Sequence, residues 1–321
     1  MTEQLNVQQM AQRLTAADNI LILCHKNPDG DTIGCGSALY YALKALDKNA
    51  AVLCSDAIPS RYAFTNARLF KGEFEPKTVV AVDVASVQLF GEGNGVPQFS
   101  RHVDLCIDHH AGNSGYADFT LLNGSAAAAA ELLYEVINAM GVAITPHIAD
   151  CLYTGLATDT GCFRYSNTTP SALRMAADLA ELGLELHELN YRLFMLKSRA
   201  RMMLEARVVN DAHFYKDGKI AVAVVTQELR RELHAEEDDM DDIGTLMRCI
   251  EGVEVGVLMK ETPQGAYKVS FRSAQHINVS EVAQEFGGGG HRRASGCLIA
   301  GPEQQAEKAL VEAIERAYAA L

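Results

Sequence analysis

An imidazole and two carboxylates stand close together near the amino end of the sequence. His25, Asp29 and Asp31 lie in the stretch His-Lys-Asn-Pro-Asp-Gly-Asp, directly after the apolar run 20–24. This pattern places the three side chains on the loop that leaves a buried strand, where hard divalent cations find ligands. The residue types and their spacing therefore indicate a metal site.

Three later segments carry the same residue types where an apolar run or a helix ends. They are Asp83, the triplet Asp108, His109 and His110, and Asp159 in the sequence Thr-Asp-Thr-Gly. Loops that follow the strands of a parallel sheet meet at one edge, so we expect these groups to form a single site. Carboxylates and imidazoles that converge in this way predict metal-assisted phosphate chemistry.

Length and composition set outer limits on the fold. The chain has 321 residues, 48% of them hydrophobic, which suits a globular protein of about two domains. No stretch approaches the roughly 18 consecutive apolar residues that a membrane helix needs, and the first residues lack the basic and apolar regions of a signal peptide. We therefore expect a cytoplasmic protein with no membrane partner.

Charge and cysteine spacing argue against two classes of function. The formal net charge is −13, whereas a protein that tracks long nucleic acid needs many Lys and Arg side chains to neutralise phosphates. Short anionic substrates are still compatible with this charge. The eight cysteines show no Cys-x-x-Cys spacing, and we interpret them as reduced core residues rather than zinc ligands.

The pattern of apolar residues predicts alternating strands and helices, which is typical of an α/β fold with a largely parallel sheet. In the first part of the chain we expect strands at 19–24, 50–54 and near 78 and 103, with helices at 3–16, 33–46, 126–140 and 147–157. A smaller α/β domain follows, with expected strands at 220–225, 253–259 and 267–271 and helices near 241–250, 279–286 and 303–320.

A long helical pattern separates the two parts. It runs from about 185 to 209 with few turn-forming residues, and a hairpin turn follows at 214–219. We therefore predict a catalytic metal-binding domain over 1–185, a helical connector over 186–210 and a substrate-binding domain over 211–321. The smaller domain is expected to contain a mixed sheet, with the active site in the cleft between the two domains.

Two glycine-containing segments are candidate phosphate contacts. Gly287–Gly290 is followed by His291, and a loop without side chains lets backbone N–H groups approach a phosphate closely. Four glycines alone are more often a flexible connection, and the neighbouring His291 and Arg292 favour the phosphate interpretation. The helix that begins beside Gly30 could also direct backbone N–H groups at an anion.

These motifs together resemble those of the DHH phosphoesterases, which are named for the triplet that stands here as Asp108, His109 and His110. Four motifs occur in that family's order, and the segment 287–291 resembles the signature of the domain that accompanies this catalytic domain in many members. The matching motifs span nearly the whole chain. Its size, without room for further domains, is similar to the compact nano-RNase and pAp-phosphatase branch.

The resemblance implies a site for two divalent cations with one shared carboxylate. Oxygen-rich ligation with a few imidazoles favours Mn²⁺, with Mg²⁺ or Co²⁺ as alternatives. Cations about 3.5–4 Å apart can share and activate a water molecule. One cation would be held by His25, Asp29 and Asp83, the other by Asp31, His109 and Asp159, with Asp83 bridging both.

The resemblance also implies roles beyond the metals. His110 would contact a phosphate oxygen or protonate the leaving oxygen, and Asp108 would orient a neighbouring histidine. Arg side chains bind phosphates through forked hydrogen bonds and stack on bases. The candidate substrate-binding residues are Arg164, Arg272, Ser273, Gly288, Gly289, Gly290, His291 and Arg292.

The implied function is a two-metal phosphohydrolase that degrades short oligoribonucleotides to mononucleotides and dephosphorylates pAp to AMP. A pApA or c-di-AMP phosphodiesterase is the first alternative, and a nucleotide-binding regulator without turnover is the second. An inorganic pyrophosphatase would need a lysine-rich carboxy-terminal motif that this sequence lacks. The sequence leaves cleavage polarity open, and it does not distinguish a monomer from a homodimer.

Overall fold

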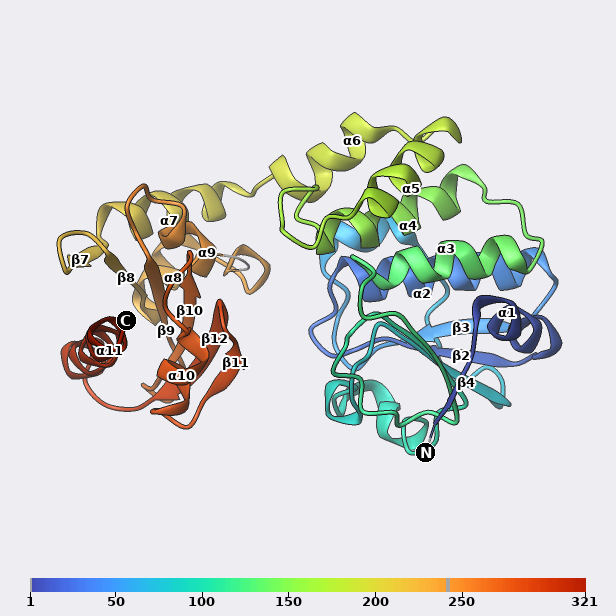
Figure 1. Ribbon diagram of the computed structural model, residues 1–321, viewed down its shortest axis with the longest axis horizontal. Coiled ribbons are helices and arrows are strands. Elements are labelled where there is room, and N and C mark those ends of the chain that lie inside the picture. Colours follow the sequence, from blue (N-terminus) through green and yellow to red (C-terminus); the bar gives the residue numbers. More distant parts are fainter. Residues whose placement is uncertain (1, 241–242) are drawn as a thin grey trace. The chain divides into compact units, whose positions relative to one another are not determined.

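The chain folds into two compact units, residues 1–196 and 197–321, in a computed structural model that describes residues 2–240 and 243–321. Each unit is built around its own six-stranded sheet (Figure 1). The division falls inside the predicted connector 186–210. The roles assigned to the two parts stay predictions at this point.

The sheet of the first unit is entirely parallel, as predicted. Its strands lie in the order β1 (Glu3–Gln4), β6 (Phe119–Leu122), β5 (Leu105–Asp108), β4 (Thr78–Val82), β2 (Ile20–Leu23) and β3 (Ala50–Leu53). After β2 the chain adds β3 on one side and then β4 on the other side. The order of the strands therefore reverses between β2 and β4, which is where ligands bind in open α/β sheets.

The strands of this sheet are apolar because both faces are covered. In β2, Ile20 and Ile22 face one buried cluster while Leu21 and Leu23 face another. Short 3-10 segments, η2 (Val87–Leu89) and η3 (Gly93–Gln98), pack near the second face. Helices α1 (Val7–Ala16), α2 (Gly30–Ala45) and α3 (Ala129–Ala139) cover the first face, and α4 (Pro146–Asp159) and α5 (Pro170–Glu181) pack on α2 and α3 away from the sheet (Figure 1).

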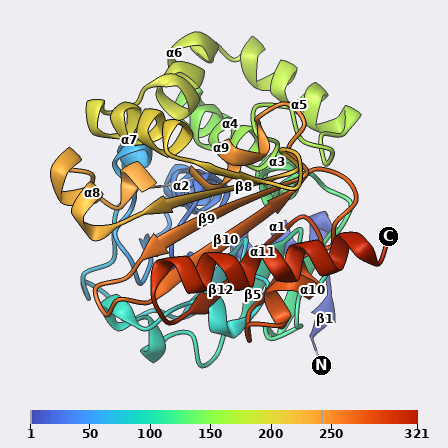
Figure 2. The same ribbon diagram turned by 90° about the vertical axis from the view of Figure 1, so that its left-hand side faces the viewer.

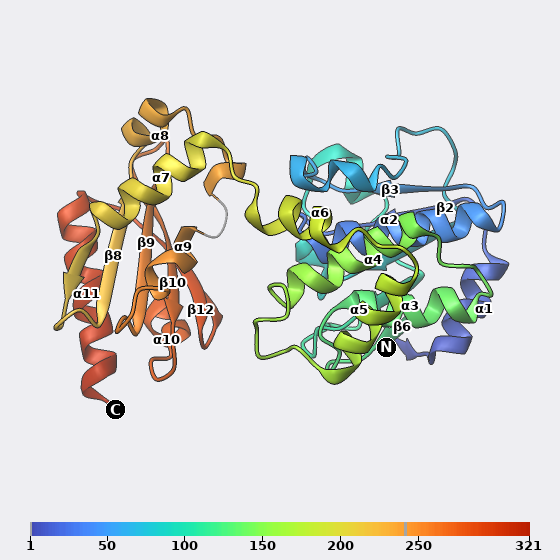
Figure 3. The same cartoon turned by 90° about the horizontal axis from the view of Figure 1, so that it is seen from above.

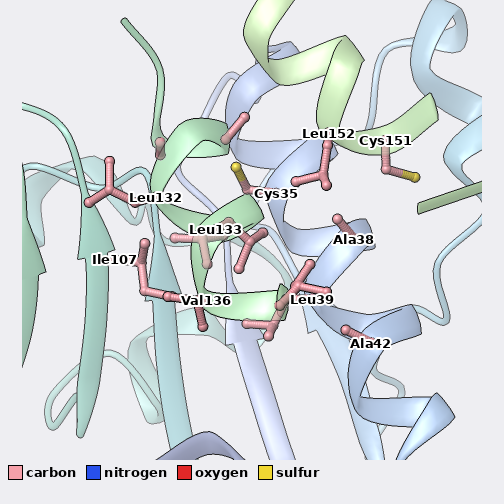
Figure 4. Packing of buried hydrophobic residues seen from close by; sticks show 14 of the residues in the cluster. Cys35, Ala38, Leu39, Ala42, Ile107, Leu132, Leu133, Val136, Cys151 and Leu152 are labelled. Atoms are coloured by element: carbon pink, nitrogen blue, oxygen red, sulfur yellow. The ribbon is translucent and has the colours of Figure 1, made fainter. Parts of the chain in front are cut away.

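Small residues let α2 and α4 approach each other closely. A Cβ atom at Gly34 would lie 2.3 Å from the carbonyl oxygen of Cys151 and 3.0 Å from the nitrogen of Gly155. Two helix backbones can come this near only where a side chain is missing. The packing of α2 with α3 and α4 is seen in Figure 4, which labels Cys35, Ala38, Leu39, Ala42, Leu132, Leu133, Val136, Cys151 and Leu152.

Three helices of the first unit begin three or more residues from the predicted start. One is α3, which begins at Ala129 rather than at 126, and caps explain the other two. The helix predicted from residue 33 begins at Gly30, because the Asp29 carboxylate accepts hydrogen bonds from the N–H groups of Asp31 and Thr32. These two N–H groups are therefore occupied, contrary to the predicted anion contact. The helix predicted from residue 3 begins at Val7 behind a capping box, and residues 3–4 form β1 instead.

The predicted long helix over 185–209 is not continuous. The chain forms α6 (Leu186–Asn190), a π-helical turn η4 (Tyr191–Met195) and α7 (Arg199–Asn210). Leu196 is extended, and the Ser198 hydroxyl caps α7 by accepting a hydrogen bond from the N–H of Arg201. A serine inside an apolar helical pattern thus marks the start of a new helix at the unit boundary.

The second unit has a mixed sheet, which confirms the prediction. Its order is β11 (Gly289–His291), β12 (Ala294–Ile299), β10 (Tyr267–Ser273), β9 (Val255–Glu261), β8 (Ile220–Val225) and β7 (His213–Tyr215). Strands β8 and β9 are parallel, and the other neighbours are antiparallel. Strands β7 and β8 form the predicted hairpin around residues 216–219.

Helices cover both faces of this sheet (Figures 2 and 3). Ile220 and Val222 of β8 belong to a cluster with α10 (Val279–Gln284) and α11 (Glu303–Ala319). Helix α11 runs across the strands in Figure 2. Ala221 and Ala223 face a second cluster with α7, α8 (Gln227–Leu233) and α9 (Ile243–Arg248). The predicted start of α9 near residue 241 lies outside the described residues.

Two compositional predictions can be compared with the structure. All eight cysteines are free thiols, and six of them are buried, whereas Cys162 is half-buried and Cys249 is exposed. The core interpretation is thus confirmed for six cysteines. In the part of the chain that the structure describes, no helix combines the length and the apolar character needed to cross a membrane.

The close contact of α2 and α4 leads to a stability prediction. Overpacking costs about 1–3 kcal/mol, while replacing a helical glycine by alanine gains about 1 kcal/mol at most. Because the obstacle at Gly34 is a backbone carbonyl, we expect the cost to exceed the gain and Gly34→Ala to lower the free energy of unfolding by about 1 kcal/mol. Gly112→Ala is the matched control, since no atom of the described residues lies within 4 Å of its Cβ position. Equal urea midpoints for the two variants would contradict this account.

Candidate metal centre

The predicted ligands gather at the carboxyl edge of the first sheet. Strands β2, β4 and β5 are neighbours and parallel, so the loops that follow them meet. Asp83 directly follows β4, Asp108 is the last residue of β5, and Asp159 is the last residue of α4. His25 follows β2, and Asp31 lies in the first turn of α2. The site therefore occupies the switch point between β2 and β4.

Within the described residues, three overlapping groups each offer ligand atoms that all lie within 4.8 Å of one another. The first group is His25, Asp29 and Asp83, and the second is Asp31, His109 and Asp159; these are the two ligand sets expected from the sequence motifs. The third group is Asp83, His109 and His110. It links the other two, because it shares Asp83 with the first and His109 with the second.

Asp83 lies between the two sets and is only 2% exposed. Its Oδ2 lies 3.7 Å from Nε2 of His25, and its Oδ1 lies 3.5 Å from Nε2 of His109. The residue has a φ of +57°, a left-handed conformation that non-glycine residues adopt at a cost and that recurs at functional sites. Its two oxygens thus face opposite histidines, as a bridging carboxylate would.

Backbone contacts orient both ligand histidines. Nδ1 of His25 lies 2.8 Å from the carbonyl oxygen of Lys26, and Nδ1 of His109 lies 3.2 Å from that of Ala126. A carbonyl oxygen can only accept, so each Nδ1 carries the proton and donates it. The Nε2 atoms, which face the carboxylates, are then left as ligand atoms, the arrangement usual for metal-binding histidines.

The Asp31 carboxylate is completely buried and is held by the start of α3. Its Oδ2 accepts from the N–H of Ala129 at 2.6 Å, and its Oδ1 accepts from the N–H of Ala130 at 3.1 Å. The thiol of Cys35 donates to Oδ1 at 3.2 Å. Sequence reasoning missed these partners. Two of them are backbone amides about a hundred residues away, which no side-chain motif reveals.

Asp108 contacts the histidine that is not in either ligand set. Its Oδ1 accepts from Nδ1 of His110 at 2.8 Å and from the N–H of His109 at 2.9 Å. Its Oδ2 accepts from the side-chain amide of Asn113 at 2.6 Å. The predicted contact between Asp108 and a neighbouring histidine is therefore present. Asn113 was not predicted, although it lies only three residues after His110.

The electrostatics of the site follow from burial and crowding of like charges. Burial raises the pKa of Asp83 well above its usual range, and the nearby charge of Asp31 adds to this effect. Burial alone would lower the pKa of His25, but the carboxylates of Asp29 and Asp83 outweigh it and raise that pKa to about 11. For His109, Asp159 and the other carboxylates likewise outweigh burial and raise the pKa to about 10. The cluster therefore attracts positive charge strongly.

The residues fit divalent cations. Oδ1 of Asp83 and Nε2 of His109 are buried and have no hydrogen-bond partner among the described residues, a state that is costly unless something binds them. Four carboxylates and two imidazoles form a donor set typical of Mn²⁺ and Mg²⁺ rather than of thiolate-bound zinc. Two divalent cations would also balance the four carboxylate charges.

The predicted substrate-binding residues fall on both units. Arg164 belongs to the first unit, where it is exposed and its Nε donates to the carbonyl oxygen of Gly161 at 2.5 Å. In the second unit, Arg272 pairs in register with Ala294 of β12, next to the exposed residues His291 and Arg292 of the hairpin between β11 and β12. Arg272 and this hairpin therefore share one corner of the sheet.

Ser273 differs from the other predicted contacts because it is fully buried. Its hydroxyl has no hydrogen-bond partner among the described residues, and its N–H donates to the carbonyl oxygen of Arg293. In this arrangement the side chain is not accessible to a ligand. Its position at the end of β10 explains this, since alternate residues of that strand face the buried cluster around Phe271.

Packing explains part of the glycine run. A Cβ atom at Gly288 would lie 2.2 Å from the carbonyl oxygen of Gly296, and one at Gly290 would lie 2.7 Å from that of Ala294. These two glycines are therefore needed for β12 to pass closely. Gly289 is exposed, and no atom of the described residues lies within 4 Å of its Cβ position, so packing does not explain this glycine.

A further group of acidic and imidazole side chains lies at the other end of the first sheet. Nε2 of His102 is 3.4 Å from a carboxylate oxygen of Asp104 and 3.4 Å from one of Asp118. His102 and Asp118 are exposed, so water solvates these side chains. Exposed acidic groups of this kind are common without a metal.

Two family matches cover most of the chain. Residues 19–156 match the DHH family, N-terminal domain, and residues 217–320 match the DHHA1 domain. A relative from Thermus thermophilus, named bifunctional oligoribonuclease and PAP phosphatase NrnA, is 35% identical over 95% of this chain and 92% of its own length. A relative of the same name from Bacillus subtilis is 23% identical over 91% of this chain and 92% of its own length.

Solved structures agree with this assignment. An exopolyphosphatase-related protein from Bacteroides fragilis matches with a TM-score of 0.88 and 25% identity, over 97% of this chain and 95% of that chain. Exonuclease RecJ bound to manganese matches with a TM-score of 0.53 and 14% identity, over 97% and 94% of the two chains, which is a likeness of fold alone. The protein therefore belongs to the DHH family, and it is a metal-dependent phosphoesterase with a DHHA1 domain.

Proposed function

We propose that the protein hydrolyses short oligoribonucleotides to mononucleotides and pAp to AMP, with two divalent cations at the edge of the first sheet. The observation that carries this proposal is the position of Asp83, whose two oxygens face the histidines of two separate ligand sets. A shared carboxylate of this kind suits a pair of cations that act on one phosphate. The names of the relatives supply the substrates.

The proposed ligands divide as the motifs predict. His25, Asp29 and Asp83 would hold one cation, and Asp31, His109 and Asp159 the other. When bound, the cations would polarise the phosphate and lower the pKa of water. Mn²⁺ is our first choice, because the donor set mixes oxygen with imidazole nitrogen, and Mg²⁺ and Co²⁺ are the alternatives.

The neighbouring residues would complete the chemistry. Asp108 accepts a hydrogen bond from Nδ1–H of His110, so the other ring nitrogen of His110 can exchange a proton with the leaving oxygen or contact a phosphate oxygen. Arg164, which is exposed shortly after the end of α4, would neutralise the scissile phosphate. These roles rest on chemistry and on position along the chain.

We further propose that the second unit selects short substrates by binding their terminal phosphate. Arg272, His291 and Arg292 would supply positive charge and N–H donors at one corner of its sheet, next to the exposed Gly289. A 5′-phosphorylated dinucleotide and pAp each have one phosphate that this unit could hold and another that the metal centre could cleave. The cytoplasmic location and the choice between a monomer and a homodimer stay predictions from the sequence.

The substrate proposal predicts a dependence on length. With Mn²⁺ present, 5′-phosphorylated RNA of two or five nucleotides should be converted to mononucleotides much faster than RNA of twenty-four, and pAp should yield AMP. Chromatography of the products measures each rate. Equal rates for the two-nucleotide and twenty-four-nucleotide RNA would contradict the proposal. Turnover of pApA alone would favour the dinucleotide-signalling alternative, and no turnover with any metal would favour the regulator.

The metal assignment predicts which carboxylate matters for binding. A cation present at 100 times its dissociation constant stabilises the folded state by about 2.7 kcal/mol, so Mn²⁺ should raise the melting temperature of the wild-type protein. Asp83→Asn should abolish this rise, because it removes the shared charge. Asp118→Asn, in the exposed group near His102, is the control and should keep it. If Asp118→Asn abolished the rise and Asp83→Asn kept it, the cation would bind at the exposed group near His102 instead.

Metal binding should also release protons. Without metal, the pKa values of His25 and His109, about 11 and about 10, keep both imidazoles protonated near neutral pH. A cation needs the neutral ring and the ionised carboxylate, so binding should release at least two protons, one from each histidine, and should weaken as the pH falls. Calorimetric titration with Mn²⁺ in buffers of different ionisation enthalpy measures this number. His109→Gln should release about one proton fewer, and a heat independent of buffer would refute the assignment.

A further inference from the structure

Asn113 occupies the loop after β5 and joins two of the motif segments. Its Nδ2 donates to Oδ2 of Asp108 at 2.6 Å and to the carbonyl oxygen of Val84 at 3.3 Å. Its Oδ1 accepts from the N–H of Gly115 at 2.8 Å. Because an N–H can only donate, this last contact fixes which end of the amide faces Asp108.

The Asp108 carboxylate depends on such donors because it is completely buried. Its Oδ1 accepts from Nδ1 of His110 at 2.8 Å and from the N–H groups of His109 and His110 at 2.9 and 3.3 Å, whereas Oδ2 accepts from Asn113. A buried carboxylate with one unsatisfied oxygen would turn toward other donors or take up a proton. The amide of Asn113 therefore fixes the plane of this carboxylate.

The plane of the Asp108 carboxylate decides the state of the His110 ring. An ionised carboxylate can only accept, so the hydrogen bond from His110 places a proton on Nδ1. When the ring is neutral, Nε2 then carries the lone pair and can take or return a proton at the substrate. Oδ1 of Asp83 also lies 3.5 Å from Nδ1 of His110, but a carboxylate that holds cations would be a weaker acceptor. A rotated Asp108 would therefore leave the Nδ1–H tautomer less favoured.

We propose that Asn113 is a positioning residue that acts through Asp108 to hold His110 with Nδ1–H directed inward and Nε2 available to the leaving oxygen. This inference rests on the proposed function. Asparagine suits the position because it donates to a carboxylate and carries no charge. An aspartate there would place a second carboxylate against Asp108, and an alanine would leave Oδ2 without this donor.

A neighbouring tyrosine supports the same loop independently of Asn113, so a positioning role of Asn113 can be distinguished from loss of loop structure. The hydroxyl of Tyr116 also donates to the carbonyl oxygen of Val84, at 2.9 Å. Loss of Asn113 therefore leaves the turn after Asp83 with a hydrogen bond in place. We accordingly expect variants of Asn113 to keep their affinity for Mn²⁺, because the ligand residues stay in place.

The test compares Asn113→Ala and Asn113→Asp with the wild-type protein loaded with Mn²⁺. Asn113→Ala should lower kcat for a 5′-phosphorylated diribonucleotide about 10- to 100-fold, with KM and the dissociation constant for Mn²⁺ little changed. Asn113→Asp should lower kcat further. Asn123→Ala is the matched control, since this loop asparagine follows β6 and its side chain accepts from Ser125, and it should keep wild-type kcat.

A double-variant cycle shows whether Asn113 acts through His110. In a His110→Gln background, Asn113→Ala should cause no further loss of kcat, because the group it positions is already gone. Additive losses would overturn the proposal, as would a loss of Mn²⁺ affinity in Asn113→Ala that matches the loss of kcat.

A spectroscopic measurement tests the same point without turnover. In protein labelled with ¹⁵N-histidine and loaded with diamagnetic Mg²⁺, the ring signals of His110, identified from the His110→Gln variant, should show the Nδ1–H tautomer when the ring is neutral. Asn113→Ala should shift this population toward Nε2–H, and an unchanged tautomer would overturn the proposal. A wild-type protein that cleaved no phosphoester would refute the proposed function, while the tautomer would still decide the role of Asn113.

Discussion

The crowding of carboxylates at one edge of the first sheet is the constraint on which the rest of the structure depends. Asp31 and Asp83 are 0% and 2% exposed, and Asp29 and Asp159 lie in the same cluster. Isolated buried carboxylates are costly, so the protein must compensate them. His25, His109 and the amides at the start of α3 do so in part. Divalent cations would balance the remaining carboxylate charge. Without them the buried carboxylates destabilise the fold, and the same carboxylates bind cations.

The helices that support this edge are shaped by the same constraint. A Cβ atom at Gly155 would lie 2.5 Å from Oδ1 of Asp31, so α4 can approach the carboxylate only with glycine there. At Gly34, the missing side chain lets α2 approach the backbone of α4. The two contacts set the separation of the helices that carry Asp31 and Asp159. Close helix packing is thus a requirement of the site as much as of the core.

The sequence was most informative where chemistry follows directly after an apolar run. Asp83 and the triplet from Asp108 end buried strands, so the order of strands and loops predicts that they meet. It was less informative where a long-range contact decides. The amide of Ala129 that binds Asp31 lies 98 residues away, and Asn113 looks like any loop asparagine until Asp108 is seen buried beside it. The break at Ser198 was missed because an apolar periodicity does not show where a cap starts a new helix.

An acidic phosphoesterase must attract anions locally while its surface repels them. With a net charge of −13, the long-range field of the protein repels a nucleic acid, and salt screens this repulsion. Neither effect steers the substrate to the site. The positive charges must therefore lie at the site itself. In the first unit the cations would provide them, and in the second unit we propose that Arg272 and the hairpin around Arg292 do so. A long RNA would gain little from so few contacts while its other phosphates met acidic surface, whereas a dinucleotide has few phosphates outside them. The charge of the whole chain thus favours short substrates independently of how the two units are arranged.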